Sequence, residues 1–248
     1  MAFLRDVFEF LTAREQWEGA EGVPTLLGEH LQLTVVSVGL AAAVALPVGL
    51  ALGHLRRGGA VAINLANVGR ALPALGLLIL AVQWVGIARP TGVLAPLHSI
   101  PAFIAMFALA LPPMLANAYV GVATVDDEVR DAARGMGMTG RQVLTRVEIP
   151  LALPLVMAGV RTATVAVVAT ATLAAYVDAG GLGRYIVDGF ATRNNVKIFA
   201  GGLLVAVLAI GLELSLAWVE RRLSSPDTGE GAVAGGRLES AAIPREAA

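Results

Sequence analysis

The chain has 248 residues, of which 56% are hydrophobic and 15% charged, and its mean hydropathy is +0.73. Soluble domains carry about 25% charged residues, so this chain lacks the polar surface needed to face water on all sides. A net charge of −1 without a basic patch excludes nucleic acid as an expected partner, and the absence of cysteine excludes disulfides and thiolate chemistry. The three histidines (His30, His54 and His98) are far apart, so we expect no metal site.

The N-terminal residues 1–25 mix charged and apolar side chains and do not fit a cleaved signal peptide. We expect them to form an external segment. Six apolar residues fit one face of a short amphipathic helix, and a poorly ordered tail is the alternative. They are Phe3, Leu4, Val7, Phe8, Phe10 and Leu11.

Five apolar stretches follow, and each is long enough to cross a bilayer. A bilayer core about 30 Å thick needs roughly 20 mostly apolar helical residues. A buried helix pair in a soluble protein can imitate one such stretch, but not five in succession. The sequence therefore predicts an all-α integral membrane protein with a transmembrane domain over residues 26–222. The predicted spans are residues 31–53, 62–88, 99–122, 150–177 and 198–219.

The basic residues predict how the spans are oriented. With five spans, eight Arg residues fall on one side and six Arg or Lys residues on the other. Because basic residues favour the cytoplasmic side, we place the N-terminus outside and the C-terminus in the cytoplasm. Residues 223–248 have no apolar periodicity, so we expect a disordered cytoplasmic tail.

One polar loop, residues 124–149, is predicted to contain two short helices. Asp126 or Asp127 suits the N-cap of the first, and glycines at 135 and 137 suit its end. Thr139 and Gln142 match a capping box that opens the second. An apolar stripe is expected along the first helix, formed by Val125, Val129, Ala132, Ala133 and Met136.

Two interpretations of this amphipathic loop remain open from its residues alone. It is either a connector that rests on the bilayer and the other spans, or a helix that fits the groove of another protein.

The loop resembles a known signature. Asp131-Ala132-Ala133, three residues, Gly137, nine residues and Val147-x-Ile149-Pro150 are similar to the cytoplasmic signature of binding-protein-dependent ABC importer permeases. The departures are Asp131 for Glu, Val147 for Ile and Ile149 for Leu. The resemblance covers about residues 20–222 and implies the type I importer fold with five transmembrane helices. It also implies that these signature residues form a coupling helix that docks on an ATPase subunit.

The same resemblance implies several partners: two ABC ATPase subunits, an extracytoplasmic substrate-binding protein, and a second permease copy or a similar chain, all at the lipid membrane. The only lysine, Lys197, is not in a Gly-Lys-Ser/Thr phosphate-binding loop. We therefore expect no enzyme activity and no cofactor on this chain, with ATP and Mg on the partner ATPase.

Further motifs are similar to those of permeases for glycine betaine, choline or carnitine. They are Trp17-Glu18-Gly19, Arg70-Ala71-Leu72-Pro73, and Ala171-Thr172-Leu173-Ala174-Ala175 with Gly180-Gly181-Leu182-Gly183. A permease for an amino acid or another small solute is the first alternative. A secondary transporter or channel would need repeats or ion sites, and a membrane enzyme would need polar catalytic clusters. Neither feature is visible in the sequence.

Polar and helix-breaking residues inside the spans are candidates for the translocation pathway or its gate. Arg70, Arg161 and Glu213 are ionisable at membrane depth, and Glu213 is placed to pair with either arginine. Structural pairing is the alternative to an inner gate. Pro73 is expected to break its span, as are Pro112, Pro113 and Pro154 in theirs.

At the outer ends of the spans, Thr172 and Tyr176 are further pathway candidates. For Tyr176 the alternative is an aromatic belt at the membrane interface. Gly180–Gly183 is either a plain turn or, by resemblance, an outer gate against which the binding protein docks.

Overall fold

The structure, a computed structural model, describes residues 2–86 and 99–223, and of Arg70 the backbone alone. The expected tail at 223–248 therefore lies outside the described residues, apart from its first residue. All regular elements in the described part are helices. In chain order they are α1 (Ala2–Thr12), η1 (Arg14–Gln16), α2 (Val23–His54), α3 (Gly59–Ala71), α4 (Ala74–Val85), α5 (Ile100–Ala123), α6 (Asp127–Gly135), α7 (Gly140–Val143), η3 (Leu144–Glu148), α8 (Ile149–Ala174), η4 (Ala175–Val177), α9 (Gly183–Thr192) and α10 (Asn195–Leu223).

Four helical segments are long and apolar enough to cross a membrane: α2, α5, the continuous stretch Gly140–Val177, and α10. The bent pair α3 and α4 brings the number to five if it counts as one span. The expected all-α membrane fold is confirmed, and each of the five apolar stretches corresponds to one of these segments.

The second apolar stretch, residues 62–88, is not one helix as far as the structure describes it. The two arms of its helix pair meet at 93°. Leu72 has an extended backbone (φ −74°, ψ 123°), and α4 begins directly after Pro73. Proline has no N–H and disfavours helical backbone in the residue before it, which accounts for a turn at this point. By contrast, α5 and α8 continue as helices through Pro112, Pro113 and Pro154.

The centre of the bundle is α5, which packs against α2 on one side and α8 on the other. Small residues make this possible. Along α2, Ala41, Ala45, Gly49 and Gly53 recur every fourth position and are all buried. A Cβ at Gly49 would lie 2.7 Å from the carbonyl oxygen of Leu115 on α5. Such spacing lets the two backbones approach closely, as is common between membrane helices.

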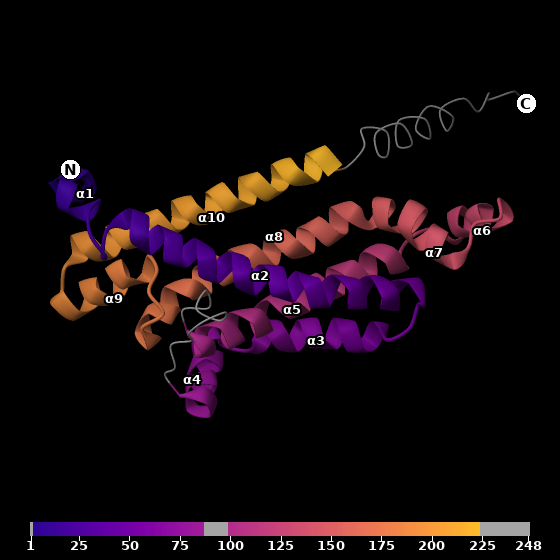
Figure 1. Cartoon of the computed structure of the whole chain (residues 1–248), viewed down its shortest axis with the longest axis horizontal. Coiled ribbons are helices and arrows are strands. Elements are labelled where there is room, and N and C mark those ends of the chain that lie inside the picture. Colours follow the sequence, from indigo (N-terminus) through magenta and orange to yellow (C-terminus); the bar gives the residue numbers. More distant parts are fainter. Residues whose placement is uncertain (1, 87–98, 224–248) are drawn as a thin grey trace, which may run out of the picture.

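Different short helices lie at the two ends of the bundle (Figure 1). At one end, α6 and α7 project beyond the ends of α2 and α5. At the opposite end, α1 and α9 lie beside the start of α10. There Phe3 of α1 contacts Phe199 edge-on at 5.5 Å, and Val7 is buried, so the predicted amphipathic helix packs on the bundle.

The expected signals at both ends of α6 are present. The side chain of Asp126 accepts a hydrogen bond from the backbone N–H of Glu128 at 2.9 Å and caps the start. At the end, Gly137 has φ +82°, and the amides of Gly137 and Met138 donate to Arg134 and Ala133. This Schellman arrangement satisfies carbonyls that the helix leaves unpaired.

The second predicted helix is present but is not separate from the next span. Thr139 and Gln142 form the expected capping box. After α7, however, the π-turn η3 leads without a break into α8. A regular α-helix would bring the ring of Pro150 against the carbonyl of Arg146. The wider π-turn in front of the proline relieves this clash, so the helix continues.

Candidate functional site

The outward side of α6 is apolar and exposed. Val129 is 43% exposed, Met136 is 72% exposed, and Ala132 is also exposed. We call these three residues the α6 surface. The predicted stripe is thus divided, because its other members, Val125 and Ala133, are buried against the bundle. An apolar patch on a doubly capped helix at the end of the molecule is suited to contact with another protein.

The other residues of the signature, at the same end of the molecule, are some of them exposed and some half-buried. Asp131 is exposed and pairs with Arg134 of the same helix at 3.5 Å. Gly137 is exposed in its turn, and Pro150 is exposed at the start of α8. Val147 and Ile149 are half-buried. The signature therefore combines surface residues with residues that fix the loop to the spans.

An ion pair joins the turn after α2 to the start of α6. Arg56, in the turn after α2, donates from Nη1 to the carboxylate of Asp127 at 2.8 Å. This hydrogen bond lowers the pKa of Asp127 and raises the pKa of Arg56. Asp127 therefore stays charged, and the pair intact, until the pH falls below the ordinary range of an aspartate.

Sequence reasoning missed a second cluster at this end, in which Arg130, Glu148 and His54 come together. Arg130 was counted only as a loop charge. The feature of the sequence that could have indicated this cluster is Glu148, a carboxylate that lies between apolar residues just before Pro150.

Of the ionisable pathway candidates, Arg161 and Glu213 are brought together. Arg161 Nε donates to Glu213 Oε1 at 2.9 Å, and its Nη1 donates to Glu220 Oε2 at 2.9 Å. Glu220 was not among the candidates. Since Glu213 pairs with Arg161, the pairing expected from the sequence is present. The side chain of Arg70 lies outside the described residues.

The uncharged pathway candidates are spread over the molecule. Pro73 is exposed at the break between α3 and α4. Thr172 is half-buried near the end of α8, where its hydroxyl donates to the carbonyl of Ala169 at 2.7 Å. Tyr176 is 59% exposed. These three residues do not form one site with the Arg161 pair.

At the end opposite α6, the glycine turn is fitted around a carboxylate. Gly180 and Gly181 have φ +76° and +80°, and the N–H of Gly181 donates to Glu29 Oε2 at 2.9 Å. A Cβ on Gly180 would lie 2.1 Å from the same oxygen. Two left-handed residues and the tight approach of Glu29 explain why glycine occupies both positions.

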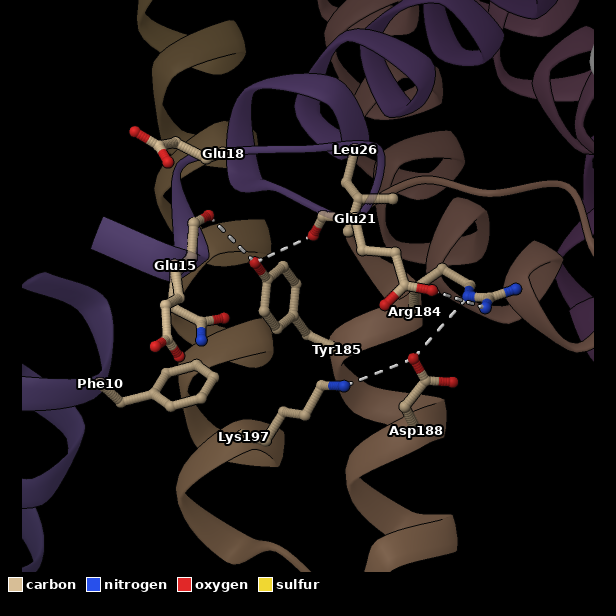
Figure 2. A pocket seen from close by; sticks show the side chains of 10 residues that line it. Phe10, Glu15, Glu18, Glu21, Leu26, Arg184, Tyr185, Asp188 and Lys197 are labelled. Carbon is tan, nitrogen blue, oxygen red and sulfur yellow. Dashed lines mark hydrogen bonds and ion pairs between the residues drawn. The ribbon is translucent and has the colours of Figure 1, made fainter. Parts of the chain in front are cut away.

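Beside this turn, a pocket of about 220 Å³ opens between the N-terminal segment and α9 (Figure 2). Its floor is Tyr185, which donates weakly to the backbone carbonyls of Gln16 and Glu21. Lys197 lies 5.7 Å above the ring of Tyr185 and pairs with Asp188 at 3.4 Å. Burial, with a smaller contribution from Glu21, raises the pKa of Tyr185. The chain's own lysine thus occupies the aromatic face of this pocket.

Comparison with known proteins assigns this arrangement to a family. Residues 43–225 match the family described as the inner membrane component of binding-protein-dependent transport systems. The glycine betaine/carnitine/choline transport system permease protein OpuCB of Bacillus subtilis is 35% identical over 197 residues, covering 79% of this chain and 86% of that protein. The choline transport system permease protein OpuBD of the same organism is 36% identical over 198 residues, covering 79% and 83%.

A third relative, the osmoprotectant import permease protein OsmY of Salmonella typhimurium, is 34% identical over 197 residues, covering 79% of each chain. Among solved structures, the inward-facing MetNI methionine ABC transporter aligns with a TM-score of 0.66 at 22% identity. That alignment covers 82% of this chain and 96% of the other, and it shows a shared fold. The chain therefore belongs to the family of inner membrane components of binding-protein-dependent transport systems and is the permease of a type I ABC importer.

Proposed function

We propose that the solute carried by this permease is a quaternary-amine osmoprotectant such as glycine betaine, choline or carnitine. The observation that carries the proposal is the identity of 34–36% over about four fifths of the chain to relatives that bear those solutes, or osmoprotectants, in their names. The pocket in Figure 2 does not by itself identify the solute, since Lys197 already covers its aromatic face.

We infer that the α6 surface docks into a groove of a separate ATPase subunit, which binds the ATP and Mg. The exposed Val129, Ala132 and Met136 supply an apolar contact, and the capped ends of α6 keep it rigid. A preformed helix loses little conformational freedom when it binds. Asp131, Ala132 and Gly137 then lie at the contact, while Ala133, Val147 and Ile149 hold the loop against the spans and Pro150 begins the span that follows. This places the α6 end of the bundle in the cytoplasm and the N-terminus outside.

The remaining partners follow from the same proposal. A second permease copy or a similar chain completes the pathway across the lipid bilayer, and an extracytoplasmic binding protein docks at the end that carries α9 and the Gly180–Gly181 turn. Arg70, Pro73, Arg161, Thr172, Tyr176 and Glu213 are proposed to line the pathway or its gate.

The solute is tested on the companion binding protein by isothermal titration calorimetry. We expect saturable binding of glycine betaine, choline or carnitine and no binding of methionine. The full transporter, reconstituted in liposomes with that binding protein, should then take up the bound solute only when ATP is supplied. Affinity for an amino acid, with none for the quaternary amines, would sink the osmoprotectant assignment and leave the permease assignment intact.

A further inference from the structure

A buried cluster around one carboxylate joins α6 to three membrane helices. Glu148, the last residue of η3, is 0% exposed. Its Oε1 lies 3.1 Å from Nε of Arg130 on α6, and its Oε2 lies 2.6 Å from Nδ1 of His54 at the end of α2. An ionised carboxylate only accepts hydrogen bonds, so Nδ1 of His54 is the donor in this contact when Glu148 is ionised.

Arg130 connects this carboxylate to a further helix. Its side chain is 3% exposed, and Nη2 donates to the backbone carbonyl of Val122 near the end of α5. One planar guanidinium thus contacts η3 and α5 from α6. We call His54, Arg130, Glu148 and the Val122 carbonyl the buried clamp.

The π-turn η3 sets the direction of Glu148. A π-turn adds a residue to the helical turn, so side chains after it are rotated by roughly 100° relative to an uninterrupted α-helix. The turn Leu144–Glu148 ends on the residue whose carboxylate is aimed into the clamp. Such turns are frequent at functional sites.

The two sides of α6 therefore differ. Outward, the α6 surface is apolar and exposed. Inward, Arg130 and Ala133 are buried. The exposed pair Arg134–Asp131 lies within α6 and connects it to nothing else, whereas the Arg130–Glu148 pair crosses between elements.

We propose that the buried clamp is the linkage through which a displacement of α6 moves α2, α5 and α8 together. Arg130 and Glu148 are then positioning residues for coupling, and the proposal rests on the docking of α6 proposed above. The physical reason is that neither charge can leave its partner without being stranded out of water. Pulling α6 outward therefore carries Glu148 and the attached helix ends with it, whereas apolar contacts alone allow one helix to slide over another.

The test uses the full transporter, reconstituted with its ATPase and binding protein, in three permease variants. Arg130→Met/Glu148→Gln removes both charges, which avoids the stranded charge that either single change would leave. Arg130→Lys keeps the charge but loses the planar fork that contacts Glu148 and Val122 at once. Arg57→Met is the matched control, because Arg57 is exposed at the same end and outside the clamp. Three quantities are measured: ATPase subunits retained on purification, ATP hydrolysis, and solute taken up per ATP.

We expect all three variants to retain the ATPase and hydrolyse ATP. Uptake per ATP should fall about tenfold in the double variant, less in Arg130→Lys, and not at all in Arg57→Met. Wild-type uptake per ATP in an assembled double variant or in Arg130→Lys would overturn the clamp. If the double variant does not assemble, the uptake per ATP of Arg130→Lys alone decides whether the clamp is needed for coupling. Failure of the wild-type permease to retain any ATPase would instead overturn the docking of α6.

Discussion

Gly135 and Gly137 lie two positions apart at the end of α6 and differ in their backbone. Neither has any atom within 4 Å of the place where a Cβ would stand, so both have room for a side chain. Only Gly137 is left-handed, with φ +82°, and its N–H completes the end of the helix at Arg134. The signature glycine is therefore required for its conformation and not for space.

We predict that Gly137→Ala loosens the end of α6 by about 1 kcal/mol, because an L side chain is strained in the left-handed region. This corresponds to roughly fivefold faster hydrogen exchange at the amides of Gly137 and Met138. Gly135→Ala is the control, and it should leave exchange unchanged or slower, since alanine favours helix. Equal exchange rates in both variants would show that backbone strain at position 137 does not determine the stability of the end of α6. The comparison needs only the purified permease and hydrogen-exchange mass spectrometry.

At the scale of the element, α2 has one face built for close packing and another that is open. Gly49 and Gly53 press against α5, where a Cβ on either would lie 2.7 Å from a backbone carbonyl oxygen. Gly39, on the same helix, has nothing within 4 Å of its Cβ position. The glycines of one membrane helix thus differ in their surroundings: Gly49 and Gly53 lie on the face packed against α5, and Gly39 lies on an open face.

Gly49→Ala should destabilise the permease by about 1–3 kcal/mol, because α2 must move away from α5 to admit a methyl group. Gly39→Ala should be neutral or raise stability by up to about 1 kcal/mol through helix propensity. Thermal unfolding of both variants in the same detergent measures the difference. A Gly49→Ala variant as stable as Gly39→Ala would mean that the α2–α5 contact is looser than described.

Sequence patterns predicted the elements whose signals are local. Apolar length marked α2, α5, α8 and α10, and capping residues marked both ends of α6. Pro73 indicated a break in its span, but a proline alone does not fix the 93° angle between the two arms. The helix α9 was not predicted, because Gly180–Gly183 was interpreted as a turn or an outer gate and no helix was expected after it. The buried clamp was missed because His54, Arg130 and Glu148 are far apart in the chain, and nothing local shows that a loop arginine is buried.

At the scale of the whole molecule, α10 is attached to the bundle in two different ways. Its first half packs closely, with Gly201 against Tyr185 of α9 and with Val205 buried. Beside its second half, an open hollow of about 730 Å³ is lined by residues of α8 and by Glu213. In the described chain, the ion pairs that join this half to α8 are those from Arg161 to Glu213 and Glu220.

We predict a graded response when these three charges are removed. Glu213→Gln leaves Arg161 paired with Glu220, so the thermal unfolding temperature should fall modestly. Arg161→Met leaves Glu213 without a cation at membrane depth and removes the partner of Glu220 as well. This is the more costly state, so the unfolding temperature should fall further. Removing all three charges, in Arg161→Met/Glu213→Gln/Glu220→Gln, should recover part of the loss, because no unpaired charge remains.

Ser215→Ala is the control for this series. Ser215 is exposed on α10 between the two carboxylates, and its hydroxyl donates to the carbonyl of Gly211 in its own helix, its one hydrogen bond within the described residues. The unfolding temperature of the Ser215→Ala variant should match that of the wild type. Uptake by the reconstituted transporter then separates pairing from gating. If the triple variant recovers stability but not uptake, these charges act in the pathway as well as in holding α10. Recovery of both would assign them to holding α10 alone, and a Glu213→Gln variant unchanged in stability and uptake would exclude both roles for Glu213.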